Sequence, residues 1–485
     1  MLSGRVESNP NMPQKRWRAA ALSTMLIAAV LLAACGSDTG DNAVAPTGEP
    51  TNSVAVSPSV AAGENSGTAT IAPADTTDNT LTDDSTLPST RSTNPSSADA
   101  QQPPPPAAST EVVVWWPVDL YPDAGSTAEV LLLDQFDGFR ETSSYGLEVR
   151  QKRASGLGVI LPTLRTAEPV APGAMPDLTL MRRSDMMTAA TEELIIPLDE
   201  WVPGDMLDDL IPGVRELGEI DGQLYGIPYA LTIYHTVYRA SAFEEPLLTF
   251  DDVLEQEPAY LFPATPSSGA QVNWTVLLQY LAAGGELVDD SGAPYLDEDA
   301  LRIVLEFYAE AVELGVFGPD LLEYSDSDEY WSEFVANDAN LIGISSMAFL
   351  SHRNTVQNVE LAAVPTTDGT SITLLDGWMW VVTTNDSEGQ KRARAFVSWM
   401  MRINQQGVYT EALGMLPSQQ QALRSWDNVP YTTFTQIMIA SARLVPSAER
   451  NNKAAVALQG AVEAVLQGTP VDQAIADAFN HMESS

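Results

Sequence analysis

The chain has 485 residues, 44% of them hydrophobic, so it can bury a substantial core, and its length allows two or three domains. It carries 24 lysines and arginines against 65 aspartates and glutamates, which gives a net charge of −41 at pH 7. A surface this acidic repels phosphate backbones, which argues against nucleic acid as a partner.

The first 34 residues have the pattern of a signal peptide. A basic cluster at 15–18 precedes a mostly apolar run at 19–32, and two alanines lead to Cys35, the only cysteine. The apolar run is shorter than the roughly 20 residues that a membrane-spanning helix needs, whereas basic, apolar and small-residue segments in this order are typical of secretion. The "LAAC" stretch resembles the bacterial lipobox, so we expect lipidation at Cys35; an ordinary signal peptide with an incidental cysteine is the alternative.

Residues 35–110 indicate a tether. This segment is rich in Ser, Thr, Pro, Ala and Asp and contains no aromatic residue. Such a composition cannot bury enough apolar surface to offset the entropy of ordering the chain. We predict a disordered tether, stiffened by the proline run at 103–106.

From residue 111 onward, strand and helix patterns alternate. In chain order they are a strand at 111–116, a helix at 126–142, strands at 145–151 and 175–181, a longer strand pair or crossover at 224–243, a helix at 301–314, strands at 339–345 and 372–384, and helices at 389–402 and 454–467. Alternating strands and helices predict an α/β fold with parallel-type layers. About 375 folded residues exceed the usual size of a single core, which predicts two lobes.

Motifs for catalysis are missing. The three histidines, His235, His352 and His481, are far apart, and no metal-ligand spacing, nucleophile elbow, phosphate loop or dinucleotide fingerprint is present. The acidic cluster "SDSDE" at 325–329 lacks the spacing of a calcium loop and indicates solvated surface, with a weak calcium site as the alternative. The sequence therefore disfavours an enzyme and predicts neither metal nor cofactor.

Several segments nevertheless occur in a recognisable order: "VVVWW", "AMPDLTLM", "IDGQLYGIPYALTIYHTVYR", "LLQYLAAGGELVDDSG", "LLDGWMWVVTTNDSEGQKRARAFVSWM" and "AVEAVLQGTPVDQAIADAF". With them, residues 111–479 resemble the bacterial extracellular solute-binding proteins of family 1, a maltose-binding-protein-like group that serves sugar ABC importers. Arg239, Phe250 and Asn337 depart from the usual Asn, Trp and Gly of that pattern.

The resemblance implies a two-lobed periplasmic-binding-protein type II fold, with a hinge and an inter-lobe cleft. Residues 111–231 and 366–412 would form lobe 1, and residues 232–365 and 413–485 would form lobe 2. The implied function is a lipid-anchored substrate-binding protein on the extracytoplasmic face of the membrane. It would capture a mono- or disaccharide by hinge closure and deliver it to an ABC permease, acting as a monomer.

Ligand sites of α/β sheets lie at the carboxyl ends of strands, and sugars need aromatic faces together with charged or polar hydrogen-bonding groups. Strand ends and family positions together single out Trp116, Asp119, Met181, Arg182, Arg183, Tyr229, Thr232, Tyr234, Trp274, Ser345, Ser346 and Trp378. The competing interpretation is core packing for the aromatic residues and ordinary surface for the charged ones. Met181 and Met347 stand where a maltodextrin binder has tryptophans, which favours a small sugar.

Three alternatives stay open. Another polar solute such as a polyamine would need several carboxylates and an aromatic box. A lipid-anchored carbohydrate-active hydrolase would need paired carboxylates about 5–10 Å apart. A binding protein of the same fold could also serve a sensor kinase instead of a permease.

Overall fold

The computed structural model describes residues 110–153, 159–167, 172–267, 269–446 and 452–484, all within one compact unit, Gln101–Ser485. The predicted signal peptide, the predicted lipid anchor at Cys35 and all but the last residue of the predicted tether lie outside the described residues. None of the helices within these ranges is long and apolar enough to cross a membrane.

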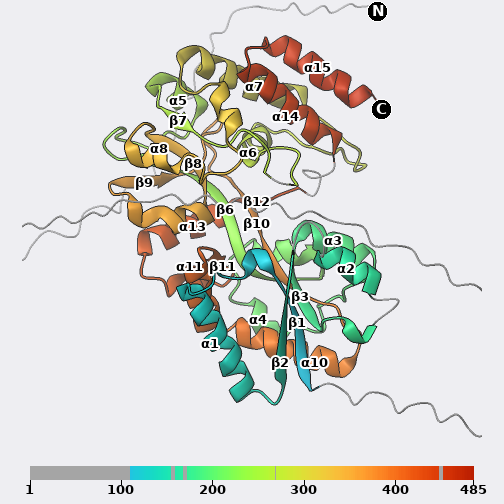
Figure 1. The fold of residues 1–485 in the computed structure, drawn as a ribbon. Coiled ribbons are helices and arrows are strands. Elements are labelled where there is room, and N and C mark those ends of the chain that lie inside the picture. The colour runs from blue at the N-terminus through green and yellow to red at the C-terminus, as the bar shows by residue number, and fades with distance from the viewer. Residues whose placement is uncertain (1–109, 154–158, 168–171, 268, 447–451, 485) are drawn as a thin grey trace, which may run out of the picture. The chain divides into compact units, whose positions relative to one another are not determined.

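The first half of the described chain is built around strands (Figure 1). Its elements are β1 (Glu111–Pro117), α1 (Thr127–Thr142), β2 (Gly146–Lys152), α2 (Ile160–Ala167), β3 (Leu178–Arg182), α3 (Arg183–Thr191), α4 (Gly204–Leu207), β4 (Glu219–Ile220), β5 (Gln223–Leu224) and β6 (Ile227–Arg239). The predicted helix at 126–142 is α1, and the segment expected to be a strand pair or crossover contains one 13-residue strand, β6.

The second half is mostly helical. It contains α5 (Phe250–Gln256), β7 (Tyr260–Leu261), α6 (Trp274–Ala282), α7 (Glu298–Leu314), α8 (Trp331–Ala336), β8 (Leu341–Ser345), α9 (Ser346–His352), β9 (Val359–Ala362), β10 (Thr373–Val382), α10 (Ser387–Met400), α11 (Ile403–Leu413), β11 (Leu416–Pro417), α12 (Gln420–Arg424), α13 (Val429–Ala440), β12 (Ala442–Leu444), α14 (Lys453–Leu466) and α15 (Val471–Glu483).

Helix α7 shows how local sequence sets an element. The Asp297 carboxylate accepts a hydrogen bond from the Ala300 N–H at the start of the helix, and Gly315 ends it in the left-handed conformation at φ 76°. Between these caps, residues such as Leu301, Val304 and Leu305 recur at helical spacing and are fully buried. The prediction for 301–314 is therefore confirmed, with one further turn at the N-terminus.

The main sheet has ten strands in the order β2-β1-β3-β10-β6-β8-β7, with β9 and β11 also paired to β6 and β12 paired to β10. Strand β1 runs parallel to β2 and β3, whereas β10 is antiparallel to both β3 and β6. The expected parallel-type layering therefore holds only in part, because β10 is antiparallel to β3 and β6, and β6 is antiparallel to β8.

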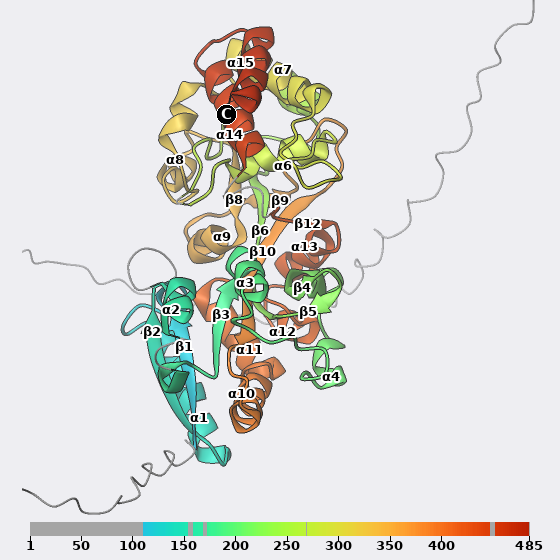
Figure 2. The ribbon, with the colours of Figure 1, turned by 90° about the vertical axis from the view of Figure 1, so that its right-hand side faces the viewer.

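The two halves of strand β6 pair with different strands. Its first half, up to Ile233, pairs with β10, and Tyr234–Tyr238 pair with β8. Both views show β6 and β10 running between two groups of helices (Figure 2). Strand β11 pairs with Leu231 and Ala230, and α12 packs on α11, so these elements associate with the first half of β6.

Three cores follow from the alternation of side chains along the strands. One contains Trp116, Leu180 and Trp380 under α1, α10 and α11. A second lies beneath α6, α7, α14 and α15. The third covers the other face of the sheet and is continuous from α2 and α3 to α8 and α9, past the middle of β6.

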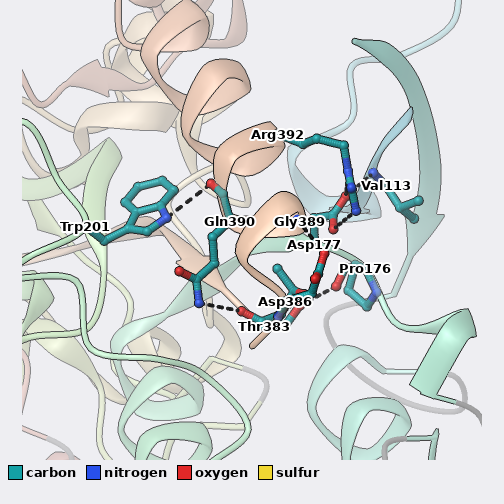
Figure 3. A network of polar contacts seen from close by, with 10 residues as sticks. Val113, Pro176, Asp177, Trp201, Thr383, Asp386, Gly389, Gln390 and Arg392 are labelled. Atoms are coloured by element: carbon teal, nitrogen blue, oxygen red, sulfur yellow. Dashed lines mark hydrogen bonds and ion pairs between the residues drawn. The ribbon is translucent and has the colours of Figure 1, made fainter. Parts of the chain in front are cut away.

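A buried ion pair joins the amino ends of β1 and β3 to α10 (Figure 3). The Asp177 carboxylate accepts hydrogen bonds from the Val113 N–H at 2.9 Å and from Arg392 Nη2 at 2.9 Å, and both charged side chains are at most 10% exposed. Close by, Asp386 caps α10 by accepting from the Gly389 N–H. This network lies at the ends of β1 and β3 opposite to their carboxyl ends.

Candidate ligand site

The expected site residues meet where β3 ends beside β10. Arg182, the last residue of β3, lies opposite Trp378 in the antiparallel register, and Asp376 lies opposite Thr232 of β6. Residues directly opposite each other point to the same face of a sheet, and so do residues two apart along a strand. Arg182, Trp378, Asp376 and Thr232 therefore share one face.

The centre of this group is an ion pair. Arg182 Nη1 donates to Asp376 Oδ2 at 3.2 Å, and the guanidinium carbon lies 5.2 Å from the centre of the Trp378 ring. The Arg182 side chain is 39% exposed and that of Asp376 only 12%. Because a guanidinium has five N–H donors and the pair uses one, Arg182 can still donate to the oxygens of a solute.

Asp376 was missed by the sequence analysis. It lies in a strand whose ten residues are all buried. A charged carboxylate without a partner in such a position would lower the free energy of unfolding. The acid within "LLDGWMW" was visible in the sequence, but its partner Arg182 is 194 residues away.

Arg183 has a different role from Arg182. Its Nη1 donates to the carbonyl oxygens of Glu216, Leu217 and Glu219 at 2.7–2.8 Å, at the end of the short helix Val214–Gly218. Burial lowers the pKa of Arg183, and the neighbouring acids, Asp376 first among them, partly offset that effect. Its donors hold this turn against α3, so we leave Arg183 out of the group that contacts the solute.

Hydroxyl groups bridge the strands where β6 changes partners. Thr373 Oγ1 donates to the Tyr234 carbonyl at 2.6 Å and accepts from the Tyr234 N–H at 2.9 Å. Ser346 Oγ accepts from the Ile233 N–H at 3.2 Å, and Ser345 Oγ caps α9. Ser346 is thus engaged by the backbone of β6 at Ile233, where β6 changes its partner from β10 to β8, and we call this point the crossing. Ser345 is engaged by the first turn of α9.

Five expected contact residues lie in the cores. Trp116 is 0% exposed, donates to the Leu120 carbonyl and packs against Trp380, while Met181, Tyr229, Tyr234 and Trp378 are 2%, 0%, 4% and 3% exposed. Their burial corrects the expectation of direct contact in this conformation. The reason is strand alternation: sequence places a side chain near a strand end but does not say which face it joins.

The two positions taken from the family pattern lie apart from this ion pair in the chain. Asp119 is exposed in the short turn Val118–Leu120 after β1. Trp274 is the half-buried first residue of α6 and follows the N-cap Asn273. It packs on the core that lies beneath α6, α7, α14 and α15. Both stay predictions.

Within the described ranges, no three His, Cys, Asp or Glu side chains come together in a way that could hold a metal ion.

Solved structures with the same fold are two-lobed solute-binding proteins. A cyclic alpha-maltosyl-1,6-maltose binding protein from Arthrobacter globiformis is 19% identical, with a TM-score of 0.61 over 76% of this chain and 97% of that one. The maltose-binding protein MalE from Listeria monocytogenes is 14% identical, with a TM-score of 0.57 over 77% and 97%. The predicted two-lobed periplasmic-binding-protein fold is confirmed.

The family follows from sequence. The family described as "Bacterial extracellular solute-binding protein" matches residues 159–436, more than half of the chain, so this protein belongs to that family. A maltotriose-binding protein from Pyrococcus abyssi is 28% identical over 155 residues, which is 31% of this chain and a third (33%) of the relative.

Proposed function

We propose that this protein is the lipid-anchored binding component of an ABC importer and that it captures a small carbohydrate between its two lobes. Its membership of the solute-binding family supports the class, and the sugar named for its maltotriose-binding relative supports the kind of solute. The observation that carries the proposal is the Arg182–Asp376 pair beside Trp378, at the end of β3 and next to the point where β6 changes partners.

The chemistry of this group suits a sugar. A carboxylate accepts hydrogen bonds from hydroxyl groups, and a guanidinium donates to hydroxyl and ring oxygens. Trp378 is only 3% exposed, and its ring supports the Arg182 guanidinium. Asp376 holds Arg182 in place, so less conformational entropy is lost when a sugar binds than with a free arginine.

The crossing supports hinge closure. At Ile233 and Tyr234, the backbone of β6 bonds to the side-chain hydroxyls of Ser346 and Thr373. A side-chain bond can follow a change in backbone direction more easily than a ladder bond can. In this proposal, a solute that contacts both lobes only when they are closed shifts the population toward the closed state.

Anchoring at Cys35, delivery to a permease and a monomeric state complete the proposal. The tether would let the binding domain move above the extracytoplasmic face of the membrane while staying near the permease.

The test is calorimetric titration and thermal shift of the processed protein with maltose, maltotriose and a panel of mono- and disaccharides. We expect at least one sugar to bind, to raise the melting temperature by mass action and to be recovered unchanged. Arg182→Met should weaken binding about tenfold or more, the typical effect of losing a charged hydrogen-bond donor.

A matched control is Arg402→Met, because Arg402 also lies over a tryptophan, Trp399, at 4.3 Å. It should leave sugar affinity unchanged. A sugar recovered in cleaved form would establish the hydrolase alternative, and binding of a polyamine but of no sugar would replace the carbohydrate.

A further inference from the structure

The apolar core is interrupted on one face of the strands that run between the two groups of helices. On the face that carries Arg182, the side chains of β10 come in the order Leu374, Asp376 and Trp378. Leu374 belongs to the core beneath α6, α7, α14 and α15, which we call the α6 core. Trp378 belongs to the core that contains Trp116, which we call the Trp116 core. Asp376 therefore stands between two separate cores.

Strand β6 repeats this order on the same face. Ala230 packs in the Trp116 core, Tyr234 packs in the α6 core, and Thr232 lies between them, opposite Asp376. On the other face, a single core runs past this point through residues such as Leu231. We call the position of Thr232 and Asp376 the polar break, and a solute between the lobes would meet the sheet there.

The acidic loop at 325–329 lies at the edge of the sheet where β7 and β8 end. These two strands are parallel and adjacent, so their carboxyl ends share an edge. The Ser345 nitrogen, at the end of β8, lies 3.5 Å from Ser327 Oγ, and Ser327 is only 3% exposed. After β7, the Thr265 N–H donates to the Tyr324 carbonyl at 3.0 Å. The loop is thus fixed at the kind of edge where α/β sheets bind their ligands, as the end of β3 is.

Tyr234 connects this loop to the polar break. It follows Thr232 by two residues on β6, so both side chains are on the same face, and its hydroxyl lies beside those of Thr275 and Tyr330. Burial is the main cause that raises the pKa of Tyr234 and of Tyr330, and the negative charge of Asp326 adds to both shifts. Because such an influence decays with distance, the Asp326 carboxylate lies near both hydroxyls.

Two of these hydroxyls are buried without a partner. Tyr234 is 4% exposed and Thr275 is 0% exposed, and neither hydroxyl oxygen has a hydrogen bond of ordinary geometry among the described residues. Nearly all buried polar groups in native proteins have a partner. Unpaired hydroxyls beside the polar break therefore indicate a place where polar atoms from outside the chain, such as a sugar hydroxyl or a water bound to it, complete the hydrogen bonding.

Asp326 has acceptor positions to spare. It is exposed, and its Oδ1 accepts a hydrogen bond from the Asp328 N–H at 3.0 Å. A carboxylate offers about four acceptor positions, so most of them stay available to a solute. Asp328 in the same loop is instead paired with His352 Nε2 of α9 at 2.7 Å. The two neighbouring acids therefore have different surroundings.

We propose that Asp326 is the contact that the side of the α6 core supplies to the solute. Its carboxylate accepts a hydrogen bond from a hydroxyl of the same sugar that Arg182 and Asp376 bind on the other side of the polar break. This inference rests on the proposed function and names a residue that determines its specificity. A sugar has hydroxyl donors on several sides, so one molecule can contact both sides of the break and hold them together, as closure requires.

The test begins with calorimetric titration of the processed protein with maltose, maltotriose and a panel of mono- and disaccharides, and continues with the sugar that binds most tightly. Asp326→Asn keeps an oxygen for the Asp328 N–H but removes the charge, and it should weaken binding about tenfold or more. Asp328→Asn is the matched control in the same loop and should leave the affinity unchanged. Urea unfolding of both variants shows whether the fold is retained.

Monodeoxy derivatives of that sugar separate a direct contact from a structural effect. The derivative that lacks the hydroxyl bound to Asp326 should bind the wild type about tenfold more weakly than the parent sugar does. The Asp326→Asn variant should bind this derivative and the parent sugar equally, because both changes remove the same hydrogen bond. A residue that only supports the fold would not produce this pattern.

The inference and the proposed function fail in different ways. If a sugar binds but Asp326→Asn binds it as tightly as the wild type does, the inference is wrong and the proposed function stands. The same conclusion follows if every deoxy derivative loses equal affinity in the two proteins. If no sugar binds the wild type, both are overturned.

Discussion

His235 makes the stability of this protein depend on pH in a way that can be calculated. It lies in the second half of β6, is 0% exposed, and its ring packs edge-on against Phe349, Tyr431 and Phe434 at 5.4–6.0 Å. Its Nε2 has no hydrogen-bond partner among the described residues. Burial lowers the pKa of His235 from 6.5 to about 4, because the charged imidazolium would lose its hydration.

The sign follows from proton binding. Between pH 6.5 and pH 4 the unfolded chain protonates this histidine and the folded chain does not, so protons favour unfolding. The stability contributed by the neutral ring is fully present above pH 6.5 and is lost as the pH falls toward 4. With these two pKa values, the loss is about 2 kcal/mol at pH 5 and about 3 kcal/mol once the pH is below both.

The assay is urea unfolding of the wild type and of His235→Leu at pH 7 and pH 5. Leucine cannot titrate, so the wild type should lose about 2 kcal/mol more than the variant over this interval. His481→Gln, an exposed histidine near the end of α15, is the control and should follow the wild type. Equal losses in the wild type and in His235→Leu, or an NMR titration of His235 near pH 6.5, would refute the argument.

Two further predictions concern the fold. Arg392→Met leaves the Asp177 carboxylate buried without its cation and should lower the free energy of unfolding by about 3 kcal/mol in urea, with part of the loss recovered when Asp177→Asn is added. Gly377→Ala would place a Cβ 2.5 Å from the Ala230 carbonyl oxygen, between β10 and β6, and should lower the melting temperature. Gly460→Ala is its counterpart, since no atom lies within 4 Å of the added Cβ in the middle of α14, and it should stabilise by about 0.5–1 kcal/mol. If the two glycine changes altered the melting temperature equally, the strands around Gly377 would have moved apart enough to accommodate the added Cβ, and the argument would be wrong.

Local sequence determined the elements. The helical spacing at 454–467 and the apolar run at 372–384 became α14 at Lys453–Leu466 and β10 at Thr373–Val382, within about two residues at each end. Periodicity depends on residues a few positions apart, so a single chain carries it completely. The family is likewise identifiable from sequence, because its characteristic segments follow one another in a fixed order along the chain.

Which side chains meet depends on contacts between residues far apart in the chain. Trp116 and Trp378 are both buried in the same core, yet Trp116 packs against Trp380 whereas the Trp378 ring lies beside the Arg182 guanidinium. Asp376 was overlooked because its partner lies in another strand, far away in sequence. Strand pairing sets the face of every side chain and depends on long-range contacts, so a local pattern places residues at a strand end but does not choose their neighbours.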